Sequence, residues 1–194
     1  DGASLDLSRI EQASNEVINL TPAPFPHWTI KEINDQPEAI TRAMNYGARI
    51  ENETDVKLGG LEQHKETLSA IKHLIIAACG TSFHAGLYGA QIMRALKSFD
   101  SVVVIDASEF TSEMIPHSGA GLLVISQSGE TKDVHRCIST ANKAGIPVFS
   151  VVNAVGSLIA RSTKCGVYLN AGREHAVAST KAFTTQVTVL ALIA

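Results

Sequence analysis

The chain has 194 residues, of which 45% are hydrophobic and 18% are charged, and its formal net charge is −3. These values are typical of one soluble globular domain with a sizeable core, and they argue against a nucleic-acid-binding surface. The apolar runs are too short to span a membrane, and three cysteines fit no disulfide framework, so we expect a cytoplasmic protein.

The first 30 residues show no sustained periodicity. The segment TPAPFP at 21–26 carries three prolines, which favours an extended linker over residues 1–30. The chain starts at Asp1 rather than Met, and its last residues to Ala194 have a helical pattern. We therefore expect a fragment of a longer protein.

Helical spacing begins at Ile30, with Ile33, Ile40 and Met44 as apolar positions. Pro37 predicts either two short helices or one that starts anew at the proline. The pair Gly59-Gly60 is read as a breaker, followed by a helix over 61–72.

Short apolar runs then alternate with helical patterns. Strands are predicted over 74–79, 102–105, 122–125, 147–152 and 166–170, and helices over 82–97, 108–114, 130–144, 157–162 and 179–194. Strands without polar alternation are buried on both faces of a sheet, so this order predicts an α/β fold. We expect a three-layer α/β/α sandwich around a parallel sheet of about five strands.

Small and hydroxyl-bearing residues follow several of these strands. The segments are CGTS at 79–82, SQSGET at 126–131 and VASTK at 177–181. The carboxyl ends of parallel strands share one edge, where free N–H groups of helix N-termini and hydroxyls suit a phosphorylated sugar. Serine, threonine and glycine are also ordinary helix caps, so capping remains the alternative. No G-x-G-x-x-G or Walker A motif occurs.

In order and spacing these segments resemble the SIS (sugar isomerase) domain. The resemblance is closest to the first of two such domains in the glutamine–fructose-6-phosphate amidotransferase (isomerising) family, the glucosamine-6-phosphate synthases. The segment HWTIKEINDQP at 27–37 is similar to that family's linker after the glutaminase domain, with Asp35 where Glu is usual. The resemblance implies a flavodoxin-like SIS domain over 31–194, preceded by a linker from an absent glutaminase domain.

The resemblance also implies a function. Such enzymes convert fructose 6-phosphate and glutamine to glucosamine 6-phosphate and glutamate, the first step towards UDP-N-acetylglucosamine. Their catalytic groups lie in other domains, so no catalytic residue is expected here, and the chain alone would bind sugar without turnover. The substrate-binding residues carried over are Gly80, Thr81, Ser82, Ser126, Gln127, Ser128, Thr131, Val177 and Ser179. Glu130 could act as a base, but an acid in a first helical turn more simply complements the helix dipole.

A second site is implied by eukaryotic-type members, which bind UDP-N-acetylglucosamine as an inhibitor. Gly59, Gly60, Thr163 and Gly166 match that site, whereas Ala160 and Tyr168 replace a serine and a histidine. The alternative is that the two glycines only form a turn into a helix.

We expect no metal site and no cofactor, because the histidines have no carboxylate at ligand spacing. The expected partners are fructose 6-phosphate or glucosamine 6-phosphate and a second copy of the chain, with neither nucleic acid nor membrane. Two other readings are a non-catalytic SIS module that senses a sugar phosphate or nucleotide sugar, and a single-domain aldose–ketose isomerase. The isomerase is weaker because no base accompanies the sugar site.

Overall fold

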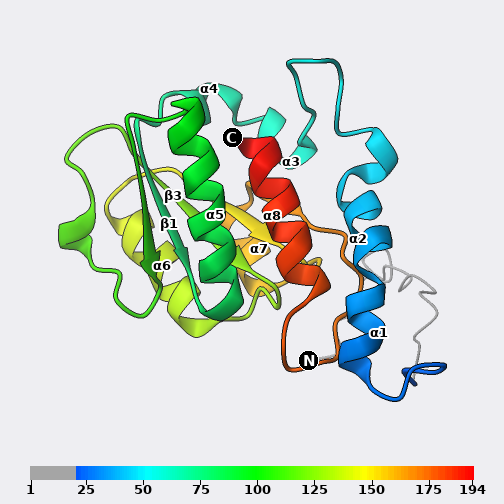
Figure 1. The fold of residues 1–194 in the computed structure, drawn as a ribbon. Helices are drawn as coiled ribbons and strands as arrows, with labels where there is room; N and C mark the ends of the chain where they lie inside the picture. Colours follow the sequence, from blue (N-terminus) through cyan, green and yellow to red (C-terminus); the bar gives the residue numbers. More distant parts are fainter. Residues whose placement is uncertain (1–20) are drawn as a thin grey trace, which may run out of the picture.

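A wholly parallel, five-stranded sheet forms the centre of the computed structural model, which describes residues 21–194 (Figure 1). The strands lie in the order β2-β1-β3-β4-β5. Their bounds are β1 His73–Ala78, β2 Ser101–Asp106, β3 Ala120–Ser126, β4 Val148–Val152 and β5 Gly166–Tyr168. All five predicted strands and the predicted parallel sheet are confirmed.

Alternate residues of each strand enter two separate hydrophobic clusters. Leu74 and Ile76 of β1 pack into the first cluster, whereas Ile75 and Ala77 pack into the second. Every residue of β3 is buried. A strand that is apolar at every position is therefore covered on both faces, which is why its sequence shows no polar alternation.

Two helices cover each face of the sheet. Helices α5 (Gly80–Leu96) and α8 (Lys181–Ile193) belong to the first cluster, and α6 (Lys132–Lys143) and α7 (Leu158–Thr163) to the second. In Figure 1, α5 and α8 lie in front of the sheet and run upwards, and α6 and α7 lie behind it. The predicted three-layer α/β/α sandwich is confirmed.

Helices α1 (Trp28–Asn34) and α2 (Gln36–Ala43) form an outer layer, with α2 packed on α8. Pro37 lies in the first turn of α2, so the two-helix alternative is confirmed. Three residues of the predicted linker, Trp28–Ile30, are already helical, and residues 1–20 of that linker lie outside the described part of the chain.

Two predicted helices differ in detail, and one 3-10 turn was not predicted. The predicted helix over 61–72 is two short helices, α3 (Gly59–Glu62) and α4 (Lys65–Ser69), because the glycine pair starts a helical turn and His64 leaves helical geometry. The predicted helix over 108–114 is a 3-10 turn, η3 (Ser112–Met114), since Asp106 accepts hydrogen bonds from Ser108 and holds a turn instead. Another 3-10 turn, η2 (Asn45–Gly47), follows α2.

Within residues 21–194 no helix is both long and apolar enough to cross a bilayer.

Candidate functional site

A pocket of about 370 Å³ opens at the carboxyl edge of the sheet. It lies beyond the ends of β1 and β3, the neighbouring strands from which the chain turns to opposite sides. Ligands of open α/β sheets bind at such a switch point. All nine residues predicted to bind substrate line this pocket, namely Gly80, Thr81, Ser82, Ser126, Gln127, Ser128, Thr131, Val177 and Ser179.

Three turns bring these residues together. The chain leaves β1 at Ala78 and starts α5 at Gly80, and it leaves β3 at Ser126 and starts α6 at Lys132. The third turn is the loop that precedes α8. Helices α5 and α6, each at least twelve residues long, thus begin at the pocket. Their N-termini present partial positive charge to it.

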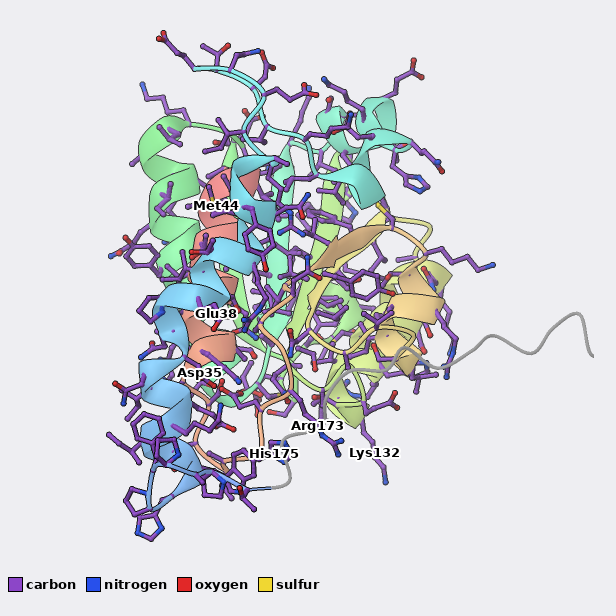
Figure 2. All side chains as sticks on the ribbon, turned by 90° about the vertical axis from the view of Figure 1, so that its right-hand side faces the viewer. Asp35, Glu38, Met44, Lys132, Arg173 and His175 are labelled. Atoms are coloured by element: carbon purple, nitrogen blue, oxygen red, sulfur yellow. The ribbon has the colours of Figure 1, made fainter. Side chains whose placement is uncertain are left out.

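Two cationic residues are chain neighbours of residues that line the pocket, although they do not line it themselves. Figure 2 shows Lys132 and Arg173 near the end of the molecule where the carboxyl edge lies. Both side chains belong to exposed residues that directly follow or precede lining residues in the chain. Positive potential over a polar pocket favours the approach of an anion.

The turn over 126–131 is organised by its own hydroxyl groups. Ser126 Oγ accepts the backbone N–H of Gly129 at 3.0 Å, and Ser128 Oγ accepts that of Glu130 at 3.2 Å. Gly129 has φ +67°, and a Cβ atom there would lie 2.0 Å from Ser157 Oγ. Only glycine therefore fits this position of the turn.

Several hydroxyl groups of the pocket residues have hydrogens that no described residue accepts. Ser126 Oγ and Thr131 Oγ1 lie 3.2 Å apart and share one hydrogen, so one of their two hydrogens stays free. Ser82 Oγ accepts the amide of Gln186 at 2.9 Å, which leaves its own hydrogen free as well. Ser179 Oγ is buried and has no hydrogen-bond partner within the described residues. These hydroxyls therefore have hydrogen-bonding capacity that the described residues do not use.

The acidic residues near the pocket have structural partners. Glu130 accepts the backbone N–H of Leu158 at 2.8 Å and does not line the pocket, so it caps α7 rather than serving as a base. Glu174, which the sequence analysis missed, does line the pocket. Its carboxylate accepts the N–H of Thr180 at 2.8 Å and that of Ala182 at 3.3 Å, at the start of α8.

The cysteines show no sign of nucleophilic activation. Burial and the charge of Asp106 raise the pKa of the Cys79 thiol, although this residue lines the pocket. Burial raises the pKa of Cys137 to about 11. A thiol whose pKa is raised is less thiolate, and so less nucleophilic, at neutral pH. Among residues 21–194 no three histidine, cysteine or acidic residues are grouped to hold a metal ion.

The second predicted site is a smaller cavity of about 190 Å³ beside β5. Gly60, Thr163 and Gly166 line it together with Ala160 and Tyr168, whereas Gly59 does not. Gly60 is required by packing, because a Cβ there would lie 1.9 Å from the carbonyl oxygen of Gly166. Thr163 Oγ1 is engaged with Ser150 Oγ at 2.9 Å and with the carbonyl of Ile159 at 3.1 Å. Binding of a nucleotide sugar there stays a prediction.

Comparison with known proteins identifies the family. A family model described as "SIS domain" matches residues 67–194. A probable glutamine–fructose-6-phosphate aminotransferase (isomerizing) of Acanthamoeba polyphaga mimivirus is 40% identical over 179 residues, covering 92% of this chain and 29% of the relative. The corresponding aminotransferase of Chlorobaculum tepidum is 41% identical over 187 residues, covering 96% and 30%. The chain thus spans about 30% of the length of these relatives.

Solved structures agree with this match. The C-terminal domain of glucosamine-fructose-6-phosphate aminotransferase from Francisella tularensis superposes with a TM-score of 0.77 and is 31% identical. The match covers 88% of this chain and 47% of that domain. The resemblance that rested on three polar turns and the segment at 27–37 therefore extends over most of the chain.

Proposed function

This chain belongs to the SIS-domain family, and we propose that its pocket binds fructose 6-phosphate as the sugar-phosphate-binding part of a glutamine–fructose-6-phosphate aminotransferase. The observation that carries the proposal is that nine residues from three distant turns line one pocket at the switch point. Its volume, about 370 Å³, falls in the range of small-molecule sites.

The polar groups suggest how the ligand would lie. The phosphate would sit at the turn over 126–131, where the N-terminus of α6, the Ser126–Thr131 pair and Ser128 supply donors. The sugar hydroxyls would face Ser82 and the loop that carries Val177 and Ser179, because hydroxyls can both donate and accept.

The chain by itself would bind this substrate without converting it. Among residues 21–194, Glu174 is the one carboxylate that lines the pocket, and it is engaged at the start of α8. Moving a proton between C1 and C2 of the sugar needs a base poised to accept it. We infer that the base, and the glutaminase that supplies ammonia, belong to other domains, and that glucosamine 6-phosphate forms only in the complete, cytoplasmic, homodimeric enzyme.

A non-catalytic module that senses a sugar phosphate is the alternative, since it would need the same pocket. The length of the natural gene product separates the two, because the enzyme requires a glutaminase domain upstream and a second SIS domain downstream.

Calorimetric titration of the chain tests the proposal. Fructose 6-phosphate should bind, fructose without phosphate should bind at least tenfold more weakly, because a charge-assisted hydrogen bond is worth about 1.5–3 kcal/mol, and no glucosamine 6-phosphate should form. Absence of heat with fructose 6-phosphate would refute the sugar-phosphate site, and turnover by this chain would refute the assignment of the base to another domain.

A nucleotide-sugar site is a second candidate function, favoured by the grouping of Gly60, Thr163 and Gly166 around one cavity. The cavity of about 190 Å³ is smaller than a typical ligand pocket, so only part of such a ligand would enter it.

A further inference from the structure

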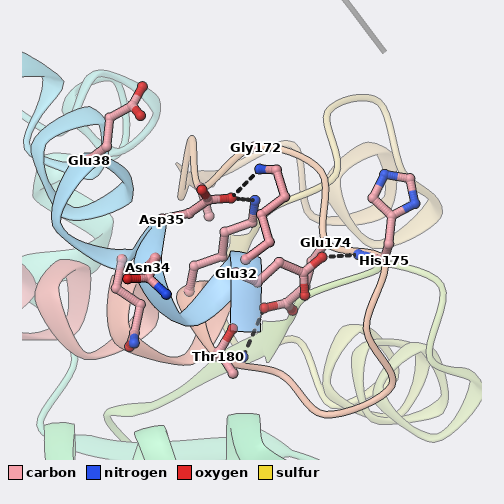
Figure 3. Close-up of polar contacts among 12 residues, drawn as sticks. Glu32, Asn34, Asp35, Glu38, Gly172, Glu174, His175 and Thr180 are labelled. Carbon is pink, nitrogen blue, oxygen red and sulfur yellow. Dashed lines mark hydrogen bonds and ion pairs between the residues drawn. The ribbon is translucent and has the colours of Figure 1, made fainter. Parts of the chain in front are cut away.

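We propose that Glu32 is a positioning residue for the sugar-phosphate pocket, and that α1 acts as a brace holding the loop over 174–181, one wall of that pocket. This inference rests on the proposed function for its effect on affinity, but its structural part can be tested separately. Figure 3 shows the polar contacts around Glu32, Asp35 and Glu174.

Glu32 is a carboxylate with unusual surroundings. It is 1% exposed, and the cost of burying its charge must be offset by hydrogen bonds. Its oxygens accept the backbone N–H of His175 at 2.6 Å and that of Ala176 at 3.2 and 3.3 Å. No other hydrogen bond to this carboxylate is found within residues 21–194. The buried charge therefore serves the loop, not the helix that carries it.

A second anchor holds the other end of the loop. Asp35 lies one turn further along, and its carboxylate pairs with Lys181 at 3.1 Å and with Lys31 at 2.9 Å. Although its partial burial opposes ionisation, the hydrogen bonds and charges of Lys31 and Lys181 lower the pKa of Asp35. Asp35 is thus ionised at neutral pH and ties the first residue of α8 to the segment over 28–36. Lys181, which the sequence left unassigned, is committed to this pair.

The residues between the two anchors line the pocket. Ala176, Val177, Ala178 and Ser179 all do so, and they belong to no helix or strand. The Val177 side chain is fully exposed, so it does not fix the loop by packing. Trp28, in the first turn of α1, stacks on His175 with ring centroids 4.1 Å apart and adds a third contact from the same helix. The pocket wall is therefore held from outside by the segment over 28–35, in addition to the Glu174 carboxylate within the loop, which accepts the N–H groups of Thr180 and Ala182.

Substitution of Glu32 separates this role from general stability. Glu32→Ala removes both acceptors and leaves two N–H groups without partners, whereas Glu32→Gln keeps one oxygen and the side-chain volume. Glu38→Gln is the matched control, because Glu38 is exposed, lies on the adjoining helix, and pairs only with Arg42 within the described residues. Amide hydrogen exchange of residues 174–179 and the affinity for fructose 6-phosphate would be measured for each variant.

We expect faster exchange in residues 174–179 and an affinity loss of about tenfold or more for Glu32→Ala, a smaller loss for Glu32→Gln, and wild-type behaviour for Glu38→Gln. If Glu32→Ala fails to fold, the comparison of Glu32→Gln with Glu38→Gln still tests whether Glu32 positions the loop. Unchanged exchange in the loop would overturn the brace even if the wild-type chain bound no sugar phosphate. Faster exchange with undiminished affinity would overturn the positioning role while leaving the proposed function intact.

Discussion

The pocket at β1 and β3 and the cavity beside β5 are built from the same kinds of residue, yet they differ in what those residues are free to do. Around the pocket, Ser82, Ser179 and the Ser126–Thr131 pair keep hydrogens or lone pairs that the described part of the protein does not use. Beside β5, Thr163 and Ser150 are bonded to each other and to backbone carbonyls, and the glycines serve close packing. We therefore propose that unused hydrogen-bonding capacity at the pocket, rather than the presence of hydroxyls, is what separates the proposed sugar-phosphate pocket from the cavity beside β5.

The largest expected effect is a loss of stability caused by a substitution beside the small cavity. Gly60→Ala would push a methyl group into the carbonyl of Gly166, which belongs to a strand and cannot easily move. We expect the free energy of unfolding to fall by about 1–3 kcal/mol, with little change in affinity for fructose 6-phosphate. Chemical denaturation and calorimetry check the two parts. A variant as stable as wild type would show that α3 can shift away from β5.

The next largest effect is a loss of affinity for fructose 6-phosphate, caused by a substitution in the pocket but not by one in the cavity. Ser126→Ala removes the acceptor for Gly129 N–H and the partner of Thr131, so affinity for fructose 6-phosphate should fall about tenfold or more. Ser150→Ala is the matched control, because Ser150 is an equally buried serine of the neighbouring strand β4 that lines the other cavity. Equal losses of affinity for fructose 6-phosphate in the two variants would mean that the ligand does not bind specifically at the pocket.

A smaller effect concerns the anchor at Asp35. The pKa of this carboxyl is lowered in the folded state, so its stabilisation is present above the unfolded pKa of about 3.9 and is lost as pH falls through the folded value. Asp35→Asn should cost less than about 1 kcal/mol at pH 7, and variant and wild type should converge in strongly acidic solution. Denaturation curves from neutral pH down to well below the unfolded pKa measure this. A gap that widens on acidification would contradict the assignment.

The smallest effect is expected for the nucleotide sugar. The family resemblance implies that Ala160 and Tyr168, which line this cavity, stand where inhibitor-binding members carry a serine and a histidine, so we expect UDP-N-acetylglucosamine to bind the wild-type chain only weakly. The double variant Ala160→Ser, Tyr168→His should gain up to about fivefold in affinity, since two restored hydrogen bonds at the weak end of their range, about 0.5 kcal/mol each, together contribute about 1 kcal/mol. No heat from either protein at millimolar nucleotide sugar would remove the cavity from consideration as a ligand site.

The sheet, and nine of the residues that line the pocket, could be predicted before the structure was known. Strands such as β3 are buried at every position, and in a parallel sheet their carboxyl ends share one edge, so the three polar turns that carry the nine residues could be grouped without coordinates. The family resemblance then supplied their expected role. Helix boundaries were less predictable where a side chain such as Asp106 competes with helical hydrogen bonding.

The brace could not be predicted in the same way. Glu32 and His175 are 143 residues apart, and nothing in the spacing of either segment indicates that they meet. Glu174 was missed for the same reason, because a lone acid in an irregular loop carries no periodic signal. The segment over 27–37 was recognised as a family motif, but its contact with the pocket loop follows only from the three-dimensional arrangement.

The stacking of Trp28 on His175 has a practical consequence. Trp28 is the single tryptophan of the chain, so intrinsic fluorescence excited at the indole reports on one place, the junction of α1 with the pocket wall. Ligand binding or a substitution that displaces this wall would change the emission of an unlabelled protein. Trp28 is thus an intrinsic fluorescence probe for movement of the loop.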